Sequence, residues 1–248
     1  MNYSFYVQHL QREHYKKESF IGWHKGKGYD PKSFIFHNSR DGADYDNLDK
    51  MHEDMVSAYP QLQYIRNVDK KFGSMGCLWG MCEMLGSFID GYPDSDFIWF
   101  TQDDNYLNLD INQFNSIFTE FLKYDANFSC WRTAHFHYKA PVTYIDKSKT
   151  FKLAGFTFKK GWWSYGDSGV FMNRSGAKII FAEVLKQRRF MEGLIEDDVY
   201  YLEDKGFYTN CDPPKDRRDE LPYLHNAICY LPPEELSERD KLNSKGSI

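Results

Sequence analysis

The sequence predicts an α/β fold in which a mainly parallel sheet is flanked by helices. Short apolar segments typical of strands alternate with segments of helical periodicity through the first hundred residues. Strands separated by helices favour right-handed crossovers and parallel pairing. The 248 residues suffice for one sizeable core, and no Gly/Ser-rich or Pro-rich linker divides residues 1–210. We therefore expect a single domain over 1–210, followed by a Pro-rich, charged C-terminal segment over 211–248.

The strands and helices follow from local patterns. Strands are predicted at 3–7, 33–37, 62–66 and 97–101, and later at 127–131 and 169–172. The clearest helix is predicted over 74–90, with apolar residues at helical spacing and Ser74 available as its N-cap. Further helices are expected around 114–122, after Ser175 through about 186, and from 196 to a left-handed cap at Gly206.

Composition limits the classes of function. The net charge of −5 argues against a dominant attraction to nucleic acid or to an anionic membrane. One local exception is the segment 139–160, where six lysines stand against one acid. A solvated face is the simplest interpretation of this segment, and binding of a phosphorylated acceptor or of nucleic acid is the alternative.

The five cysteines form no C-x-x-C pair and are odd in number, so neither a zinc site nor a complete disulfide framework is indicated. A reducing, cytoplasmic setting fits this usage. No stretch approaches the roughly 20 apolar residues of a transmembrane helix, so no transmembrane segment is expected.

The most informative segment runs from Phe97 to Leu107. Its apolar run is typical of a strand buried on both faces, and it leads directly into Asp103 and Asp104. Open α/β sheets bind ligands at the carboxyl ends of their strands. Two hard oxygen donors at that position suit Mg²⁺ or Mn²⁺ carrying a diphosphate. A solvated turn between strand and loop is the alternative, because Asp and Asn are common turn residues.

Two later segments add polar or flexible groups. Gly166 and Gly169 lie just before and at the start of a predicted strand, where they either allow close approach of a sugar ring or make a bend. Glu196, Asp197 and Asp198 begin a predicted helix, where a carboxylate either caps the helix or acts as a general base. Between the two sets of acids, the aromatic rings of residues 162 and 163 offer faces for sugar stacking, with a core role as the alternative.

Three segments resemble, in their order along the chain, the motifs of nucleotide-sugar glycosyltransferases with the Rossmann-like GT-A fold. They are Gln102-Asp103-Asp104, Tyr165 to Ala177 and Glu196 to Tyr200. The first is similar to their DxD motif, with Gln102 standing where an acid is usual. The resemblance implies that Asp104 is the direct metal ligand and that Asp103 and Gly169 contact the donor. It also implies that Asp197 or Asp198 is the catalytic base, and a late histidine such as His225 could complete the coordination of Mn²⁺ or Mg²⁺.

The resemblance divides the domain into a nucleotide-binding half, 1–105, and an acceptor-binding half, 106–210. In the first half, Asn38 and Arg40 follow the second predicted strand and Arg66 ends the third, where all three could hold base or ribose. The implied activity is transfer of a hexose from a nucleoside-diphosphate sugar, a UDP-sugar being favoured, to a hydroxyl acceptor, with inversion expected. A saccharide acceptor is favoured over a phosphorylated or nucleic-acid one.

Two other functions remain as alternatives. A nucleotidyltransferase would use the same carboxylates, but the turn from Val7 to Arg12 has no glycine for a phosphate loop. A non-catalytic module that binds carbohydrate or nucleic acid would leave the acids after the buried strand unexplained. Many Golgi members of the resembled family carry a membrane anchor, and no such segment is expected in this sequence. We therefore expect a bacterial or viral enzyme, or a chain from which an anchor was removed.

Overall fold

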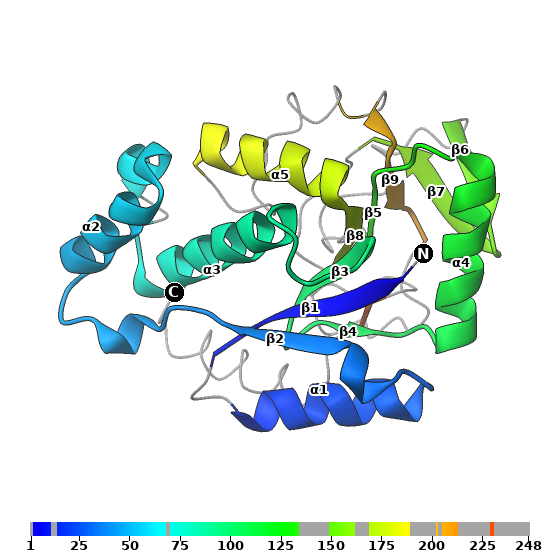
Figure 1. Cartoon of the computed structure of the whole chain (residues 1–248), viewed down its shortest axis with the longest axis horizontal. Coiled ribbons are helices and arrows are strands. Elements are labelled where there is room, and N and C mark those ends of the chain that lie inside the picture. The colour runs from blue at the N-terminus through cyan, green and yellow to red at the C-terminus, as the bar shows by residue number, and fades with distance from the viewer. Residues whose placement is uncertain are drawn as a thin grey trace.

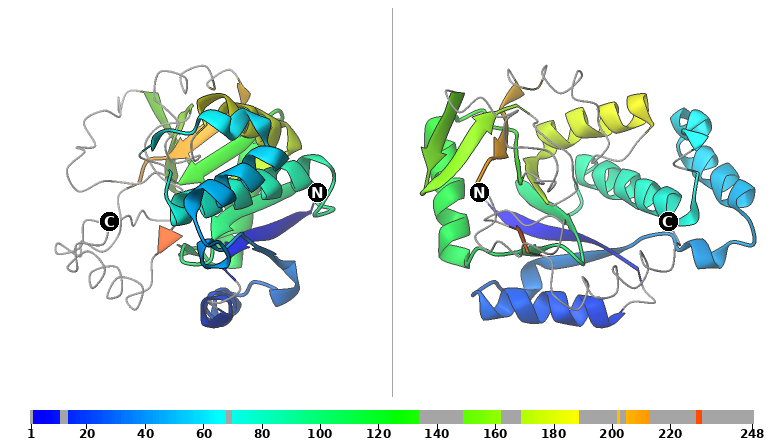
Figure 2. Two further views of the ribbon diagram at one scale, coloured as in Figure 1. Left: turned by 90° about the vertical axis from the view of Figure 1, so that its left-hand side faces the viewer. Right: turned by 180° about the vertical axis from the view of Figure 1, so that it is seen from behind.

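A sheet lies between two layers of helices in the computed structural model of the chain (Figures 1 and 2). The structure describes residues 2–10, 14–67, 70–133, 149–161, 169–188, 202, 205–212 and 229–230. Within these residues the helices α2, α3 and α5 pack on one face of the sheet, and α1 and α4 pack on the other. The predicted α/β class is confirmed.

The main sheet has eight strands in the order β2-β1-β3-β8-β5-β9-β7-β6. Their bounds are β1 Tyr3–His9, β2 Phe34–Asn38, β3 Phe97–Gln102, β5 Cys130–Thr133, β6 Thr150–Leu153, β7 Phe156–Lys160, β8 Val170–Asn173 and β9 Phe207–Asn210. Strands β2, β1 and β3 pair in parallel, and only β7 and β8 run against the other six. A second sheet pairs β4, Tyr106–Leu107, with β10, Cys229–Tyr230, in antiparallel orientation.

The helices are α1 His14–Gly26, α2 Leu48–Ala58, α3 Phe72–Ile89, α4 Ile111–Tyr124 and α5 Arg174–Gln187, with 3-10 turns η2 Pro31–Ser33, η3 Gly42–Asp44 and η4 Pro60–Tyr64. Side-chain caps explain several of their starts. Asp110 and Gln113 form a capping box at α4, and the Asn173 side chain accepts a hydrogen bond from the Gly176 amide at α5.

Strand β3 separates two hydrophobic cores. Phe97 and Trp99 face the core under α1 and α4, while Ile98 and Phe100 face the core under α2, α3 and α5. This alternation confirms that the strand is buried on both faces. It also fixes the position of the residues that follow it, because a buried parallel strand cannot shift its register without moving every side chain to the other face.

Several local predictions were wrong. Residues 62–66 form no strand, because Pro60–Tyr64 is the 3-10 turn η4. Ser74 lies inside α3, whose N-cap position is Lys71, and α5 begins after Asn173 rather than after Ser175. The strand expected at 127–131 begins only at Cys130. The helix expected from 196 lies outside the described residues, although Gly206 does have the left-handed φ of +72°.

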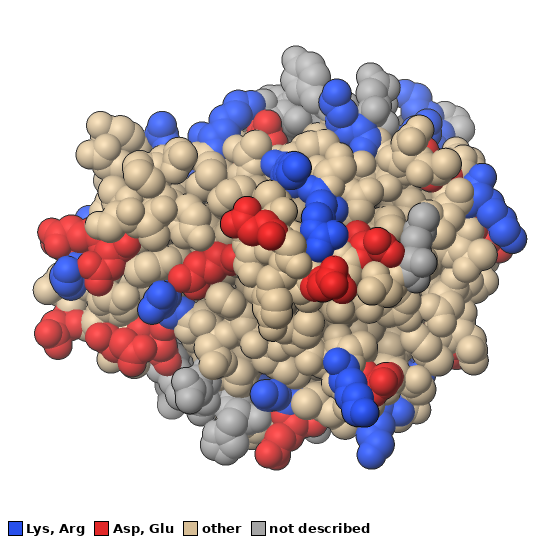
Figure 3. Space-filling model, viewed as in Figure 1, with Lys and Arg blue, Asp and Glu red and all other residues tan. Residues whose placement is uncertain are grey.

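Acidic side chains gather at the edge of the molecule formed by α2, whereas both signs of charge are interspersed over the rest of the face in Figure 3. Of the lysines in the 139–160 segment, Lys152 is exposed but Lys159 is buried at 3% exposure. In the part of the chain that the structure describes, no helix is both long and apolar enough to cross a membrane.

Candidate functional site

A cavity of about 580 Å³ opens where β1, β2 and β3 end. We call it the strand-end cavity. It is lined by Gln8, His9, Leu10, Lys16, Ser39, Arg40, Asp41, Gly42, Ala43, Tyr45, Phe72, Gly73, Gly76, Cys77, Gln102, Asp103 and Asp104. This volume lies within the usual range for small-molecule sites, roughly 300 to 1,000 Å³.

The floor of the cavity is built by the ends of two neighbouring parallel strands. Gln8 of β1 pairs with Gln102 of β3, and the Asp103 amide donates a hydrogen bond to the Gln8 carbonyl at 3.1 Å. One residue further on, His9 Nδ1 lies 2.6 Å from Asp103 Oδ2. Both side chains of this pair are buried, His9 at 4% exposure and Asp103 at 7%.

A tight turn presents the second acid. The Asn105 amide donates to the Gln102 carbonyl at 3.1 Å, which places Asp103 and Asp104 at the two central positions. Asp104 is half-buried and lines the cavity. The predicted position of the two acids at the carboxyl edge of the sheet is confirmed, and the turn is the geometry that brings both to the cavity.

One wall of the cavity depends on glycines in α3. A Cβ added at Gly76 would lie 2.6 Å from the Arg40 carbonyl oxygen, and one added at Gly80 would lie 2.7 Å from Gln8 Nε2. Because neither residue has a Cβ, the chain leaving β2 lies directly against the helix. The same segment is held at η3, where the Asp41 side chain accepts from the Ala43 amide at 2.9 Å.

Arg40 lines the cavity wall and contacts two residues of α3. Its guanidinium lies 5.0 Å from the centre of the Trp79 ring and donates to Glu83 Oε1 at 3.3 Å. Glu83 also contacts His37 Nε2 at 3.0 Å. Burial would raise the pKa of Glu83, but the bonds with His37 and Arg40 outweigh it and the net shift of this pKa is downward. An ionised Glu83 therefore anchors Arg40.

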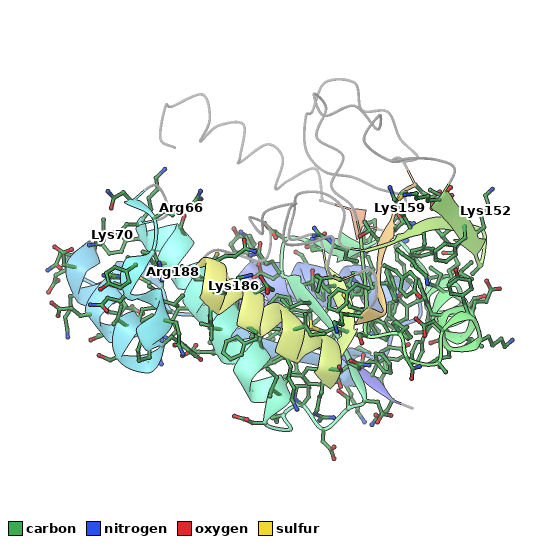
Figure 4. All side chains as sticks on the ribbon, turned by 90° about the horizontal axis from the view of Figure 1, so that it is seen from above. Arg66, Lys70, Lys152, Lys159, Lys186 and Arg188 are labelled. Carbon is green, nitrogen blue, oxygen red and sulfur yellow. The ribbon has the colours of Figure 1, made fainter. Side chains whose placement is uncertain are left out.

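The structure brings together Arg40, Asp103 and Asp104 of the predicted site residues. Asn38 ends β2 with an exposed side chain and is not among the residues that line the cavity. Arg66 follows η4 rather than a strand and lies with Lys70 at the α2 end of the molecule in Figure 4, also outside the lining.

Gly169 has a role in packing. Its φ is +99°, and a Cβ added there would collide with the Trp99 ring. The bend before β8 thus needs glycine for both conformation and space. Asp197, Asp198 and His225 lie outside the described residues, as do the two tryptophans at 162 and 163.

Sequence reasoning missed most of the cavity lining. Gln8 and His9 carried a signal, because they end an apolar strand as Gln102 and Asp103 do. Lys16, Tyr45 and Cys77 carried none, since only the tertiary fold brings α1, the loop after η3 and α3 to the strand ends.

The donor set of the cavity suits a hard divalent cation only with help from a ligand. Among the described residues, no three His, Cys, Asp or Glu side chains are grouped so that they could hold a metal ion by themselves. Asp104 offers carboxylate oxygens beside the Asp103–His9 pair, and Mg²⁺ and Mn²⁺ are commonly held by one or two carboxylates and completed by phosphate oxygens. The residues present fit such a substrate-completed site.

No protein-family model matches the chain, and no curated protein matches it in sequence. Among solved structures, it is similar to a glycosyltransferase involved in the glycosylation of the major capsid of PBCV-1. The TM-score is 0.35 at 12% identity, over 83% of this chain and 73% of that one. It is also similar to the apo form of mouse xyloside xylosyltransferase 1, with a TM-score of 0.38 at 10% identity, over 82% of this chain and 69% of that one.

Proposed function

We propose that the chain is a metal-dependent glycosyltransferase that moves a hexose from a nucleoside-diphosphate sugar to a hydroxyl acceptor. The observation that carries this proposal is the strand-end cavity, into which a turn after the buried strand β3 presents Asp103 and Asp104. A cavity at the carboxyl ends of parallel strands is the usual ligand site of an open α/β sheet.

The other lining groups suit a nucleotide. Lys16 and Arg40 supply positive charge for phosphate oxygens, and Tyr45 and Phe72 supply ring faces for a base. The amides of Gln8 and Gln102 add polar groups on the floor. The two carboxylates would repel a bare diphosphate, so a bound anion of this kind requires a cation between them.

In this proposal Asp104, with His225, would hold Mn²⁺ or Mg²⁺, and the metal would offset the charge of the departing diphosphate. Arg40 and Lys16 orient the same phosphates. Asp197 or Asp198 removes the proton from the acceptor hydroxyl as its oxygen attacks the anomeric carbon, so the configuration at that carbon inverts. A UDP-sugar is the favoured donor and a saccharide the favoured acceptor.

The test is a thermal-shift screen of nucleotide sugars with and without Mn²⁺, followed by analysis of the products. A bound donor should raise the melting temperature only when Mn²⁺ is present, since a ligand stabilises the folded state by mass action. Slow hydrolysis of the donor should release a nucleoside diphosphate. Release of pyrophosphate from a nucleoside triphosphate would instead identify a nucleotidyltransferase, and binding without any turnover would favour a non-catalytic module.

A further inference from the structure

The His9–Asp103 pair joins β1 to β3 at the floor of the strand-end cavity. Its two atoms are 2.6 Å apart, which is short for a nitrogen–oxygen hydrogen bond and typical of one in which a partner is charged. The backbone already links the same positions, because the Asp103 amide donates to Gln8 and the strands pair from Tyr3 to Gln8. The side-chain bond is therefore not needed to hold the two strands together.

His9 is itself held on its other side. Its carbonyl oxygen accepts a hydrogen bond from the Ser39 amide at 2.8 Å. Its ring packs edge-on against Phe36 of β2, with the ring centres 5.7 Å apart. The imidazole is thus fixed between β2 and β3, and a hydrogen bond from a fixed ring restricts the rotation of the carboxylate that accepts it.

We propose that His9 is a positioning residue that holds the Asp103 carboxylate in one orientation toward the complex of divalent cation and nucleoside diphosphate. This inference rests on the proposed function and adds to it that the two aspartates have different roles. Asp104 binds the cation, while Asp103 is preorganised by a hydrogen bond from His9 Nδ1. Burying an imidazole and a carboxylate carries a desolvation cost that an apolar pair of similar volume would avoid. Its presence in the cavity floor, rather than elsewhere between the strands, points to the ligand.

Substitutions of His9 can separate loss of the hydrogen bond to Asp103 from loss of the histidine itself. In His9→Asn the amide nitrogen takes the place of Nδ1, so the hydrogen bond to Asp103 is kept. In His9→Gln the amide reaches the place of Nε2, and in His9→Leu no donor remains, so both lose the bond. His52→Leu is the control, because His52 is a half-buried histidine of α2 that bonds to the Leu62 carbonyl outside the cavity.

The measurement is the Kd for Mn²⁺ in the presence of saturating uridine diphosphate, by titration calorimetry on the full chain. His9→Asn should bind Mn²⁺ within about threefold of the wild type. His9→Gln and His9→Leu should bind about 10- to 100-fold more weakly, the size of effect that follows the loss of an outer-shell hydrogen bond at a metal site. In an Asp103→Ala background the His9 substitutions should have no further effect on Kd, whereas a purely structural role of His9 would persist there.

An unchanged Kd in His9→Gln would overturn the role of His9 but not the proposed function. Equally weakened Mn²⁺ binding in His9→Asn and His9→Gln would have the same consequence. If His9→Leu fails to fold, the comparison of Kd between His9→Asn and His9→Gln still tests the positioning role of His9. A wild-type chain that binds neither Mn²⁺ with uridine diphosphate nor any nucleotide sugar would overturn the proposed function and this role of His9 with it.

Discussion

Asp103 and Asp104 are neighbours in the chain but lie in different surroundings. Asp103 is buried against His9, while Asp104 is half-buried at the cavity. We expect Asp104→Asn to abolish metal-dependent donor binding without a loss of folding stability. Asp103→Asn should weaken binding less, about tenfold to a hundredfold, because an asparagine oxygen can still accept from His9.

Calorimetric titration of the donor with and without chelator checks this difference between the two acids. Asp46→Asn is a matched control, since Asp46 is exposed and outside the cavity but the change in charge is the same. Full activity of the wild type in excess chelator would contradict the metal role of Asp104.

His24 is a second buried histidine, and its surroundings predict a pH dependence of stability. Its Nδ1–H donates to the Phe20 carbonyl at 2.7 Å, and the Leu107 amide donates to Nε2 at 3.1 Å, so the neutral ring links α1 to β4. Burial is the main cause that lowers the pKa of His24 from 6.5 to about 4. Between about pH 4 and pH 6.5 the unfolded chain therefore binds a proton that the folded chain does not.

The free energy of unfolding should consequently fall as the pH drops from 6.5 to about 4, by up to about 3 kcal/mol from this residue. Chemical denaturation across that interval measures the loss. His24→Gln keeps an acceptor for the Leu107 amide but cannot titrate, so its stability should depend less steeply on pH. Parallel curves for the two proteins would show that His24 is not responsible.

At the scale of elements, the start of α3 sets the shape of the cavity wall. An alanine at Gly76 would place its Cβ 2.6 Å from the Arg40 carbonyl, whereas one at Gly73 meets nothing within 4 Å. Both substitutions gain up to about 1 kcal/mol of helix propensity. We expect Gly73→Ala to be neutral or stabilising. Gly76→Ala should instead lose about 1 to 3 kcal/mol, because the clash is with backbone that must move.

Gly76→Ala should also weaken donor binding, since the displaced segment carries Arg40 and Asp41. Urea denaturation and donor titration of both variants test the two effects. Equal stabilisation by the two alanines would mean that the chain after β2 does not lie against α3 as described.

The elements also show where sequence patterns succeed. Strand β3 was predictable because its residues are apolar on both faces, and the two acids after it could be placed from that strand alone. The strand expected at 62–66 was wrong for a physical reason. Leu62 and Ile65 are both buried while Gln61 and Gln63 are exposed, a spacing of three that fits a 3-10 turn starting at Pro60. Over five residues this pattern and a strand's alternation are hard to separate.

The site was predictable only in part, because a cavity is a property of the whole molecule. Its acids follow one strand, but its cations and rings come from α1, from the segments on either side of η3, and from α3, which the sequence does not connect. His9 shows the difference most clearly. Its position next to Asp103 depends on β1 and β3 being neighbours in the sheet, although β2 separates them in the chain.

At the scale of the whole molecule, the proposed reaction requires a base on the side opposite the departing diphosphate. Asp197 and Asp198 remain the candidates by their place in the sequence. Replacing the catalytic one by Asn should leave donor affinity nearly unchanged and lower kcat by about 10² to 10⁴, the usual range for a lost general base. The other, if it caps a helix, should cost about 1 kcal/mol of stability instead.

Direct displacement assisted by such a base inverts the anomeric configuration, because the acceptor oxygen attacks from the side opposite the leaving group. NMR of the product, with the donor's own configuration as the reference, measures this outcome independently of the two variants. A product that retains the donor's configuration would exclude single displacement. It would require either a covalent intermediate or attack from the face of the leaving group, and in both cases neither aspartate would be the base proposed above.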